Sequence, residues 1–394
     1  MKCEMPRFDV EDGILMFVAP ELEDATRCAI GREYCSPKKL SVKVLKDAMV
    51  SPGEGLFDGS GKYVKGTSVH DGWPWEGRTA PTCKNLKDED VVYLGAFNPC
   101  WGHCLTDCLQ RLWFAYSSDV SSHIKSLHFV YSVSPRMAAL PNNFLELLKI
   151  LGYDIAQLIR IDEPTRFKNV HLPESCFYYD READMRRYTS EYKELIDLIV
   201  DKACPNVSNS GKSVYFSRTA WKTNKEIGEK LIENEFSRIG YEVVHPECMS
   251  LIEIINTLRS CKRFASTDGS IAHNIVFVDN NAEAVIVRKA SYVNAYQDCL
   301  NRVSGVKVVY VDANMSNMLY DKNRPWLGPF FLYVNKRLAA LTSGRSRFPA
   351  LLYLKYCTIS LFVKLRKKCS KTLIGRLMRL LRKASQSTNM TKRD

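Results

Sequence analysis

The pattern of apolar and polar residues predicts a first half of the chain in which strands alternate with helices. Strands are expected at 91–97, 126–133 and 155–161, and helices at 102–116 and 144–151. Asn142 can cap the second helix, and Gly152 can end it. Alternation of this kind indicates a layered α/β domain. Residues 1–85 contain patches rich in Gly and Pro, and we expect an irregular region packed on this domain.

A second alternation follows a short polar segment, residues 204–212. Its strands are expected at 213–217, 241–245, 262–266, 284–288 and 306–311. Two pairs with capping-box spacing, Thr223 with Glu226 and Ser250 with Glu253, mark helix starts. Asp268 is placed to cap the helix after the third strand. Five strands with intervening helices predict a Rossmann-like domain.

The length of 394 residues is enough for two domains. We expect an N-terminal α/β domain at 1–203, a linker at 204–212, a Rossmann-like domain at 213–344 and a tail at 345–394. The composition, 45% hydrophobic and 25% charged, excludes a disordered or fibrous protein. The first 20 residues lack the uninterrupted apolar run of a signal peptide. We therefore expect a cytoplasmic enzyme whose 14 Cys are reduced thiols.

The basic character of the chain is concentrated in the tail. The formal net charge is +12, and residues 345–394 hold 14 Lys or Arg with Asp394 as the single acidic residue. A 16-residue apolar run at 348–363 is too short for a comfortable membrane span. At 371–383, apolar residues share one helical face and basic residues lie elsewhere. This pattern favours an anionic membrane surface over nucleic acid, and a helix pair packed on the body is the alternative.

The first candidate site is the segment FNPCWGHCLTD, residues 97–107, at the end of a strand and the start of a helix. Open α/β sheets place ligands at this edge. His103 in the first turn is disposed to stay neutral and can act as a general base, and Asp107 shares its face four residues later. A structural histidine that holds the loop is the alternative. Cys100, Cys104 and Cys108 also share a face, but a metal site lacks the second ligand segment that it needs.

Three further segments lie at the ends of later strands. Arg218 follows the strand at 213–217 and offers a forked donor for phosphate. Glu247 follows the next strand and can accept the hydroxyls of a ribose. The segment STDGSIAHN, residues 266–274, turns a strand into a helix whose start could bind phosphate, although an ordinary capped helix is the alternative. Together the four segments suggest a cleft that holds a nucleotide-linked ligand.

The order of these segments resembles glycosyltransferase family 61, including its bacterial polysaccharide-biosynthesis members. The likeness covers roughly residues 90–312. WGHCLTDCLQRL resembles the family's W-G-H segment, VYFSR its strand ending in Ser-Arg, and DGSIAHNIVF its Gly-small-x-x-x-Asn-x-x-Phe motif. The stretch from Gly240 through Glu247 resembles a fourth motif. Many members have His where this chain has Asp268, and here His273 follows four residues after the motif glycine.

The resemblance implies a GT-B architecture, with two Rossmann-like domains that face each other across a cleft. It implies inverting transfer of a sugar from a nucleotide-sugar donor to a glycan or lipid-linked acceptor, with no cofactor and no required metal. The expected catalytic residues are His103 and Asp107. The donor would be bound by Arg218, Glu247, Gly269, Ser270, His273 and Asn274, and the acceptor side would include Trp101 and Gly102. The setting would be capsule or other cell-surface polysaccharide synthesis on the inner face of the membrane.

Two other functions remain open from the sequence. One is an enzyme like the polysaccharide pyruvyl transferases, which would use phosphoenolpyruvate in place of a nucleotide sugar. The other is a non-catalytic, membrane-bound scaffold that kept the fold. The scaffold would be recognised by a closed cleft without the cluster of His103, Arg218 and Glu247.

Overall fold

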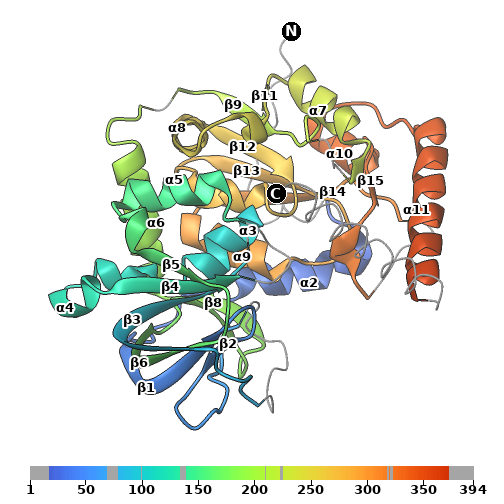
Figure 1. Ribbon diagram of the computed structural model, residues 1–394. Coiled ribbons are helices and arrows are strands. Elements are labelled where there is room, and N and C mark those ends of the chain that lie inside the picture. Colours follow the sequence, from blue (N-terminus) through green and yellow to red (C-terminus); the bar gives the residue numbers. More distant parts are fainter. Residues whose placement is uncertain are drawn as a thin grey trace, which may run out of the picture.

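The protein is described by a computed structural model that covers residues 17–68, 79–98, 100–133, 139–208, 210–221, 225–316, 319 and 323–371. Two β-sheets with their helices make up the body, and the long helix α11 (Ala350–Lys371) lies at one edge of it (Figure 1). The chain is therefore mixed α/β, as the alternation of elements predicts.

The first sheet contains six strands in the order β2-β1-β6-β3-β4-β5. The strands are β1 (Val42–Ser51), β2 (Gly55–Phe57), β3 (Asn85–Phe97), β4 (His128–Val133), β5 (Leu158–Ile161) and β6 (Thr165–Pro173). The four strands β6, β3, β4 and β5 run parallel to one another, whereas β1 pairs antiparallel with β2 and β6. The expectation that residues 1–85 are irregular is wrong here. In β1, Lys and Asp lie among the apolar residues, which hides the strand pattern.

The helical run predicted at 102–116 is present but changes type along its length. It comprises α3 (Trp101–His103), a π-helical turn η1 (Cys104–Cys108) and a 3-10 turn η2 (Leu112–Ala115). The hydroxyl of Thr106 donates to the carbonyl of Gly102 at 3.1 Å, within the widened turn. Single π turns inside helices are frequent at functional sites. This irregular segment carries the predicted catalytic residues.

The remaining elements of the first part are short, apart from two helices. They are α4 (Ser122–Lys125), α5 (Asn142–Leu151), η3 (Ile155–Gln157), the hairpin of β7 (Phe177–Asp180) and β8 (Met185–Tyr188), and α6 (Ser190–Ala203). Gly152 ends α5 in the left-handed conformation, as predicted, whereas Asn142 is the first residue of the helix and Pro141 precedes it.

The second sheet contains the five predicted strands, all parallel. They are β9 (Ser213–Phe216), β11 (Glu242–Val244), β12 (Arg263–Thr267), β13 (Glu283–Arg288) and β14 (Lys307–Asp312). Their order is β11-β9-β12-β13-β14, so the direction of winding reverses between β9 and β12. Doubly wound sheets bind ligands outside the carboxyl ends of the two strands at such a reversal. Arg218 and Gly269 follow those two strands.

The elements around the second sheet agree in part with the capping predictions. They are β10 (Glu226–Ile227), α7 (Glu229–Arg238), η4 (Pro246–Cys248), α8 (Leu251–Ser260), η5 (Ala272–Phe277), α9 (Ala295–Ser304), η6 (Pro325–Leu327), β15 (Phe330–Phe331) and α10 (Lys336–Thr342). The capping box of Ser250 and Glu253 is confirmed at α8. Thr223 lies outside the described residues, and the helix predicted from it begins only at Glu229, because Glu226 belongs to a strand.

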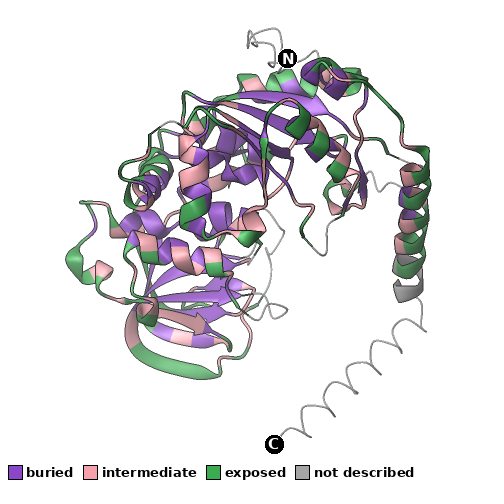
Figure 2. Cartoon of the chain, turned by 90° about the horizontal axis from the view of Figure 1, so that it is seen from above, coloured by how far each residue is buried: buried purple, intermediate pink, exposed green. Residues whose placement is uncertain are grey.

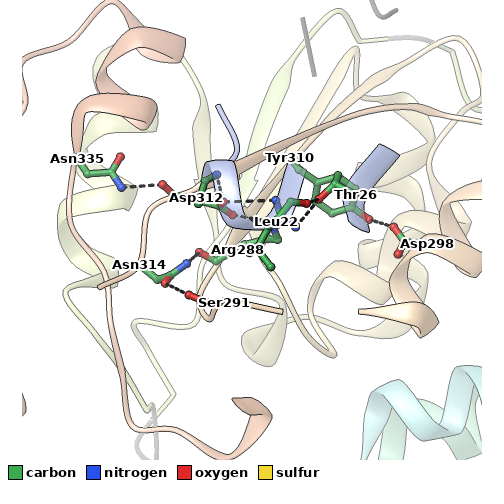
Figure 3. A network of polar contacts seen from close by, with 10 residues as sticks. Leu22, Thr26, Arg288, Ser291, Asp298, Tyr310, Asp312, Asn314 and Asn335 are labelled. Atoms are coloured by element: carbon green, nitrogen blue, oxygen red, sulfur yellow. Dashed lines mark hydrogen bonds and ion pairs between the residues drawn. The ribbon is translucent and has the colours of Figure 1, made fainter. Parts of the chain in front are cut away.

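Helix α2 (Pro20–Gly31) packs on the second sheet, whereas the sequence predicted packing on the first domain. A buried ion pair explains its position (Figure 3). Arg288 Nε donates to Asp312 Oδ1 at 2.6 Å, and Arg288 Nη1 donates to the hydroxyl of Thr26 in α2 at 3.0 Å. The backbone N–H of Ala19 donates to Asp312 Oδ2 at 2.5 Å. Buried charges need this full set of partners, and the N-terminal segment supplies two of them.

The two sheets are joined by one continuous apolar core. Buried residues of α5 and α6 from the first part and of α8 and η5 from the second belong to the same cluster, among them Leu148, Ile199, Ile254 and Ile275. The carboxylate of Glu146 in α5 accepts the backbone N–H of Leu251 at the start of α8, at 2.9 Å. The first part and the second therefore pack as neighbours, and the segment of Trp101–His103 contacts the turn at Gly269 and Ser270.

Candidate active site

The WGH segment (Trp101–His103), which follows the first sheet's β3, contacts the DGS segment (Asp268–Ser270), which follows β12 of the second sheet. A Cβ added to Gly102 would lie 2.8 Å from Ser270 Oγ and 2.8 Å from His273 Nδ1, so this position requires glycine. Cys100 Sγ is 3.3 Å from Ser270 Oγ. The indole N–H of Trp101 donates to Asn274 Oδ1 at 2.9 Å. The structure thus brings together two segments that are about 170 residues apart in the sequence.

His103 and Asp107 form a pair at this junction. Nδ1 of His103 lies 2.6 Å from Asp107 Oδ2, and their side chains are 27% and 7% exposed. A carboxylate on Nδ1 fixes the tautomer and orients the ring, so proton transfer would use Nε2. The spacing of four residues and the turn of η1 place the carboxylate behind the ring. This geometry suits a general base held by a second residue.

Two residues that the sequence analysis did not select surround His103. The ring of Tyr296 in α9 meets His103 edge to face, with centroids 6.1 Å apart, and stacks on His273 at 6.4 Å. The guanidinium of Arg186 in β8 lies 4.4 Å from the centre of the Tyr296 ring and donates to its hydroxyl at 2.5 Å. Nothing in the local sequence marks Tyr296, because its role depends on where α9 crosses the catalytic segment.

His273 is buried beside this pair. Burial, reinforced by the nearby His103, lowers the pKa of His273 from 6.5 to about 4. Neither ring nitrogen makes a hydrogen bond of good geometry to a residue that the structure describes. His273 is therefore neutral at pH 7 and lies against Gly102 rather than in solvent.

Arg218 lies at the carboxyl end of β9, where the sequence predicts a phosphate-binding group. Its side chain is 28% exposed, and Nη1 is 3.5 Å from Oε1 of the buried Glu226. Lys289, directly after β13, donates to the same oxygen at 2.7 Å. Two cations that follow β9 and β13, on either side of β12, thus share one carboxylate.

The turn after β12 differs from the predicted capped helix. Asp268 Oδ1 accepts the N–H of Gly269 at 2.6 Å and the side-chain amide of Asn294 at 3.0 Å, and η5 begins only at Ala272, without a side-chain cap. Gly269 has φ of +111°, which favours glycine. The backbone N–H of Gly269 is engaged by Asp268, and phosphate binding at this turn stays a prediction.

The comparison with known proteins agrees with the order of these segments. A family model described as glycosyltransferase 61 matches residues 101–286. This segment is a glycosyltransferase family 61 domain. No curated protein matches the chain. The matched range begins at Trp101 and ends within β13, so it contains the WGH segment, Arg218, Glu247 and the DGS turn. The protein is accordingly a glycosyltransferase.

Glu247 lies in η4 just after β11, which pairs with β9, the strand that precedes Arg218. Its Oε1 atom is buried and has no hydrogen-bond partner among the residues described, and the same is true of His245 Nδ1. A buried carboxylate oxygen without a partner is costly unless a ligand or water satisfies it. The contact of Glu247 with a ribose stays a prediction.

Two of the three cysteines at 100–108 pack toward the core of the glycosyltransferase. Cys104 and Cys108 are buried, and each sulfur lies 3.7 Å from the carbonyl oxygen of Asn98. Cys100 is exposed and faces Ser270. In the part of the chain that the structure describes, no three His, Cys, Asp or Glu side chains are grouped as metal ligands would be.

Proposed function

We propose that the protein transfers a sugar from a nucleotide-sugar donor to a hydroxyl of a glycan or lipid-linked acceptor, with inversion and without a metal. The observation that carries this proposal is the junction of the WGH and DGS segments, with the His103–Asp107 pair beside it. His103 would remove the proton of the acceptor hydroxyl as its oxygen attacks the anomeric carbon. Asp107 would hold the ring and stabilise the imidazolium that forms.

The donor would bind at the carboxyl ends of β9, β11 and β12. Arg218 would contact the diphosphate, with the turn at Gly269 and Ser270 against it, and Glu247 would accept the ribose hydroxyls. Positive side chains near the leaving diphosphate would stabilise its negative charge, as a bound metal ion does in other transferases. We therefore expect transfer to continue in the presence of EDTA.

The assigned roles of Asn274 and Trp101 need refinement. Asn274 is 2% exposed, donates to the carbonyl of Ile271 at 2.8 Å and accepts from the Trp101 indole. Its amide is thus engaged within the protein, so we propose that it positions Trp101 and Gly102 on the acceptor side. His273 would support the same contact between the WGH and DGS segments, because its ring lies against Gly102. This arrangement is compatible with a GT-B architecture, in which acceptor and donor groups come from different halves of the chain.

The rival functions differ in what they require of this junction. A pyruvyl transferase would need a site for phosphoenolpyruvate. A scaffold would not need a histidine held by a carboxylate, as His103 is by Asp107. The hydrogen-bonded pair of His103 and Asp107, together with the family 61 domain, favours a nucleotide-sugar glycosyltransferase.

We also propose that the C-terminal segment binds an anionic membrane surface. Helix α11 exposes an outer stripe of apolar residues, Leu351, Leu354, Leu361, Phe362 and Leu365. Figure 2 shows α11 at the edge of the molecule with exposed residues along it. No acidic residue occurs from 345 to 393, and the amphipathic pattern at 371–383 lies outside the described residues. An apolar stripe with basic flanks fits an anionic bilayer.

This location would place the enzyme on the cytoplasmic face of the membrane, where it would extend capsule or another cell-surface polysaccharide. Among the helices that the structure describes, none combines the length and apolar character needed to cross a bilayer. The proposed contact is therefore made by the outer stripe of α11 together with the basic residues that follow it.

A donor screen tests the proposed function. Nucleotide sugars of several bases, with phosphoenolpyruvate as the competing ligand, would be compared by the rise in melting temperature that each causes. The proposal expects a rise with at least one nucleotide sugar and none with phosphoenolpyruvate. A rise with phosphoenolpyruvate alone would support the pyruvyl transferase, and no rise with any ligand would support the scaffold.

A further inference from the structure

A buried lysine lies at the carboxyl end of the central strand β13. Lys289 is 7% exposed, and its ammonium donates to Glu226 Oε1 at 2.7 Å and lies 4.7 Å from the centre of the Phe330 ring. An ammonium has three N–H donors. Within the described chain, Glu226 is the only acceptor to which this ammonium donates. The other N–H donors of this buried ammonium are therefore available to an anionic ligand.

The position of Lys289 places its charge at the donor end of the sheet. A Cβ added to Gly269 would lie 2.9 Å from Lys289 Nζ, so the ammonium lies directly over the glycine turn after β12. Arg218, after β9, approaches Glu226 at 3.5 Å. The two cations therefore flank the point where the winding of the sheet reverses, which is where doubly wound sheets bind phosphates.

Cations and carboxylates meet at this point. Burial raises the pKa of the Glu226 carboxyl, but Lys289 and Arg218 outweigh that effect and hold the pKa below its ordinary value. Glu226 is therefore an anion at neutral pH that contacts both cations. Two further carboxylates lie nearby: Glu229 accepts the backbone N–H of Arg218 at 3.0 Å, and Asp268 accepts from Gly269 and Asn294.

One backbone donor of this turn is already engaged within the protein. The N–H of Gly269 is used by Asp268, and η5 is a 3-10 helix of six residues. A leaving diphosphate gains negative charge as the bond to the anomeric carbon breaks, so side-chain cations must compensate for it. Arg218 alone is one such group, and Lys289 is the second within reach of the same turn.

We propose that Lys289 binds the diphosphate of the donor together with Arg218, and that Glu226 holds both cations in position before the donor arrives. The inference rests on the proposed function. In the reaction, the acceptor oxygen bonds to the anomeric carbon and its proton passes to His103. The bond from that carbon to the diphosphate breaks, and its electron pair stays on the phosphate oxygen, where Lys289 and Arg218 stabilise it.

The test compares phosphate-dependent binding in three variants of the full chain. Lys289→Met removes the cation, and Glu226→Gln removes the counter-ion alone. The double variant Lys289→Met with Glu226→Gln removes the whole buried pair, a change that proteins often tolerate in stability. The control is Lys212→Met with Glu242→Gln, an exposed pair at 2.9 Å at the amino ends of β9 and β11, on the opposite edge of the second sheet. Calorimetry would measure the affinities for UDP, GDP, CDP, ADP and the matching nucleosides.

We expect the double variant to bind the preferred nucleoside diphosphate roughly 10- to 100-fold more weakly, as for a lost charged hydrogen bond, with unchanged affinity for the nucleoside. The control pair should keep wild-type affinity, and Glu226→Gln should weaken binding less than the double variant does, because both cations remain. Equal affinities of wild type and double variant would overturn the role of Lys289 and leave the proposed function standing. If Glu226→Gln alone weakens binding of the nucleoside diphosphate as much as the double variant does, the carboxylate and not Lys289 accounts for the effect, and the role of Lys289 is overturned as well. If wild type binds no nucleoside diphosphate, both proposals fail.

Discussion

At the scale of single residues, the site depends on side chains whose neighbours come from distant parts of the chain. The sequence predicted His103, Asp107 and Arg218 because each follows a recognisable strand or lies in a familiar motif. It could not predict Lys289, which looks like an ordinary lysine after an apolar strand, or Tyr296, whose contact with His103 depends on the path of α9. It also assigned Asp268 to a cap, because it could not show that Gly269 and Asn294 compete for that carboxylate.

Arg218→Ala should weaken the binding of the nucleoside diphosphate by roughly 1.5–3 kcal/mol, because a charged hydrogen bond is lost. Arg218 follows β9, and its guanidinium is 3.5 Å from the Glu226 carboxylate that Lys289 also contacts. Calorimetric titration checks the value. Unchanged affinity would remove Arg218 from the donor site.

The buried His273 predicts a pH dependence of stability. Its pKa of about 4 in the folded protein lies below the ordinary value of 6.5. Because the unfolded chain binds the proton more readily, the free energy of unfolding is highest above pH 6.5 and falls as the pH drops toward 4, by roughly 3 kcal/mol for this group. Charges facing the ring include His103, Asp107 and Lys289.

Denaturant titrations of wild type and His273→Phe between pH 4 and 7 measure this effect. Phe keeps the aromatic stack on Tyr296 but cannot bind a proton, so its curve should be flatter over this range. Parallel curves for the two proteins would show that His273 is protonated in the folded state as readily as in the unfolded one.

At the scale of elements, the sequence predicted best where local signals agree. The parallel strands of the second sheet and α8 with its capping box are confirmed because apolar runs and caps mark them independently. The helix predicted from Thr223 failed because Glu226 pairs in a strand with Phe330, a contact of more than 100 residues' separation. The π turn at Cys104–Cys108 has no local sequence signal either.

Helix α11 presents two faces with different roles. Tyr356 is 1% exposed and stacks on Phe331 with ring centroids 5.5 Å apart, so one face belongs to the body. The outer stripe lies on the other face, where Leu351 is 84% exposed. Truncation after residue 344 would uncover Phe331, so a change confined to the stripe is the cleaner experiment.

Replacing Leu351, Leu354 and Leu361 by Ser should weaken binding to anionic vesicles while the melting temperature stays close to that of wild type. Each Leu that enters the bilayer adds to membrane affinity, whereas it contributes little to folding because it is exposed on the protein surface. Co-sedimentation with vesicles measures binding, and Tyr356→Ala is the matched control that should destabilise the protein. If the triple variant pellets with vesicles as wild type does, the stripe is not the membrane contact.

At the scale of the whole molecule, catalysis is assigned to a junction between two parts of the chain that share one core. The family 61 domain spans that junction, from the WGH segment to β13. Elements outside the matched range complete the site's surroundings, because α9 supplies Tyr296 and the segment after β13 supplies Lys289. The general order of strands and helices was predictable, whereas the packing of α2 on the second sheet was not, because it depends on the buried pair of Arg288 and Asp312.

The most direct test of the account is the steady-state kinetics of His103→Ala and Asp107→Asn with the donor found by the screen. For His103→Ala the account predicts that kcat falls by about 10²–10⁴, while the donor dissociation constant stays near that of wild type, because the base acts on the acceptor. Asp107→Asn should cause a smaller loss, since it disturbs only the orientation of the ring. A larger loss in Asp107→Asn would move the base to Asp107. Wild-type kcat in His103→Ala would contradict catalysis at this junction.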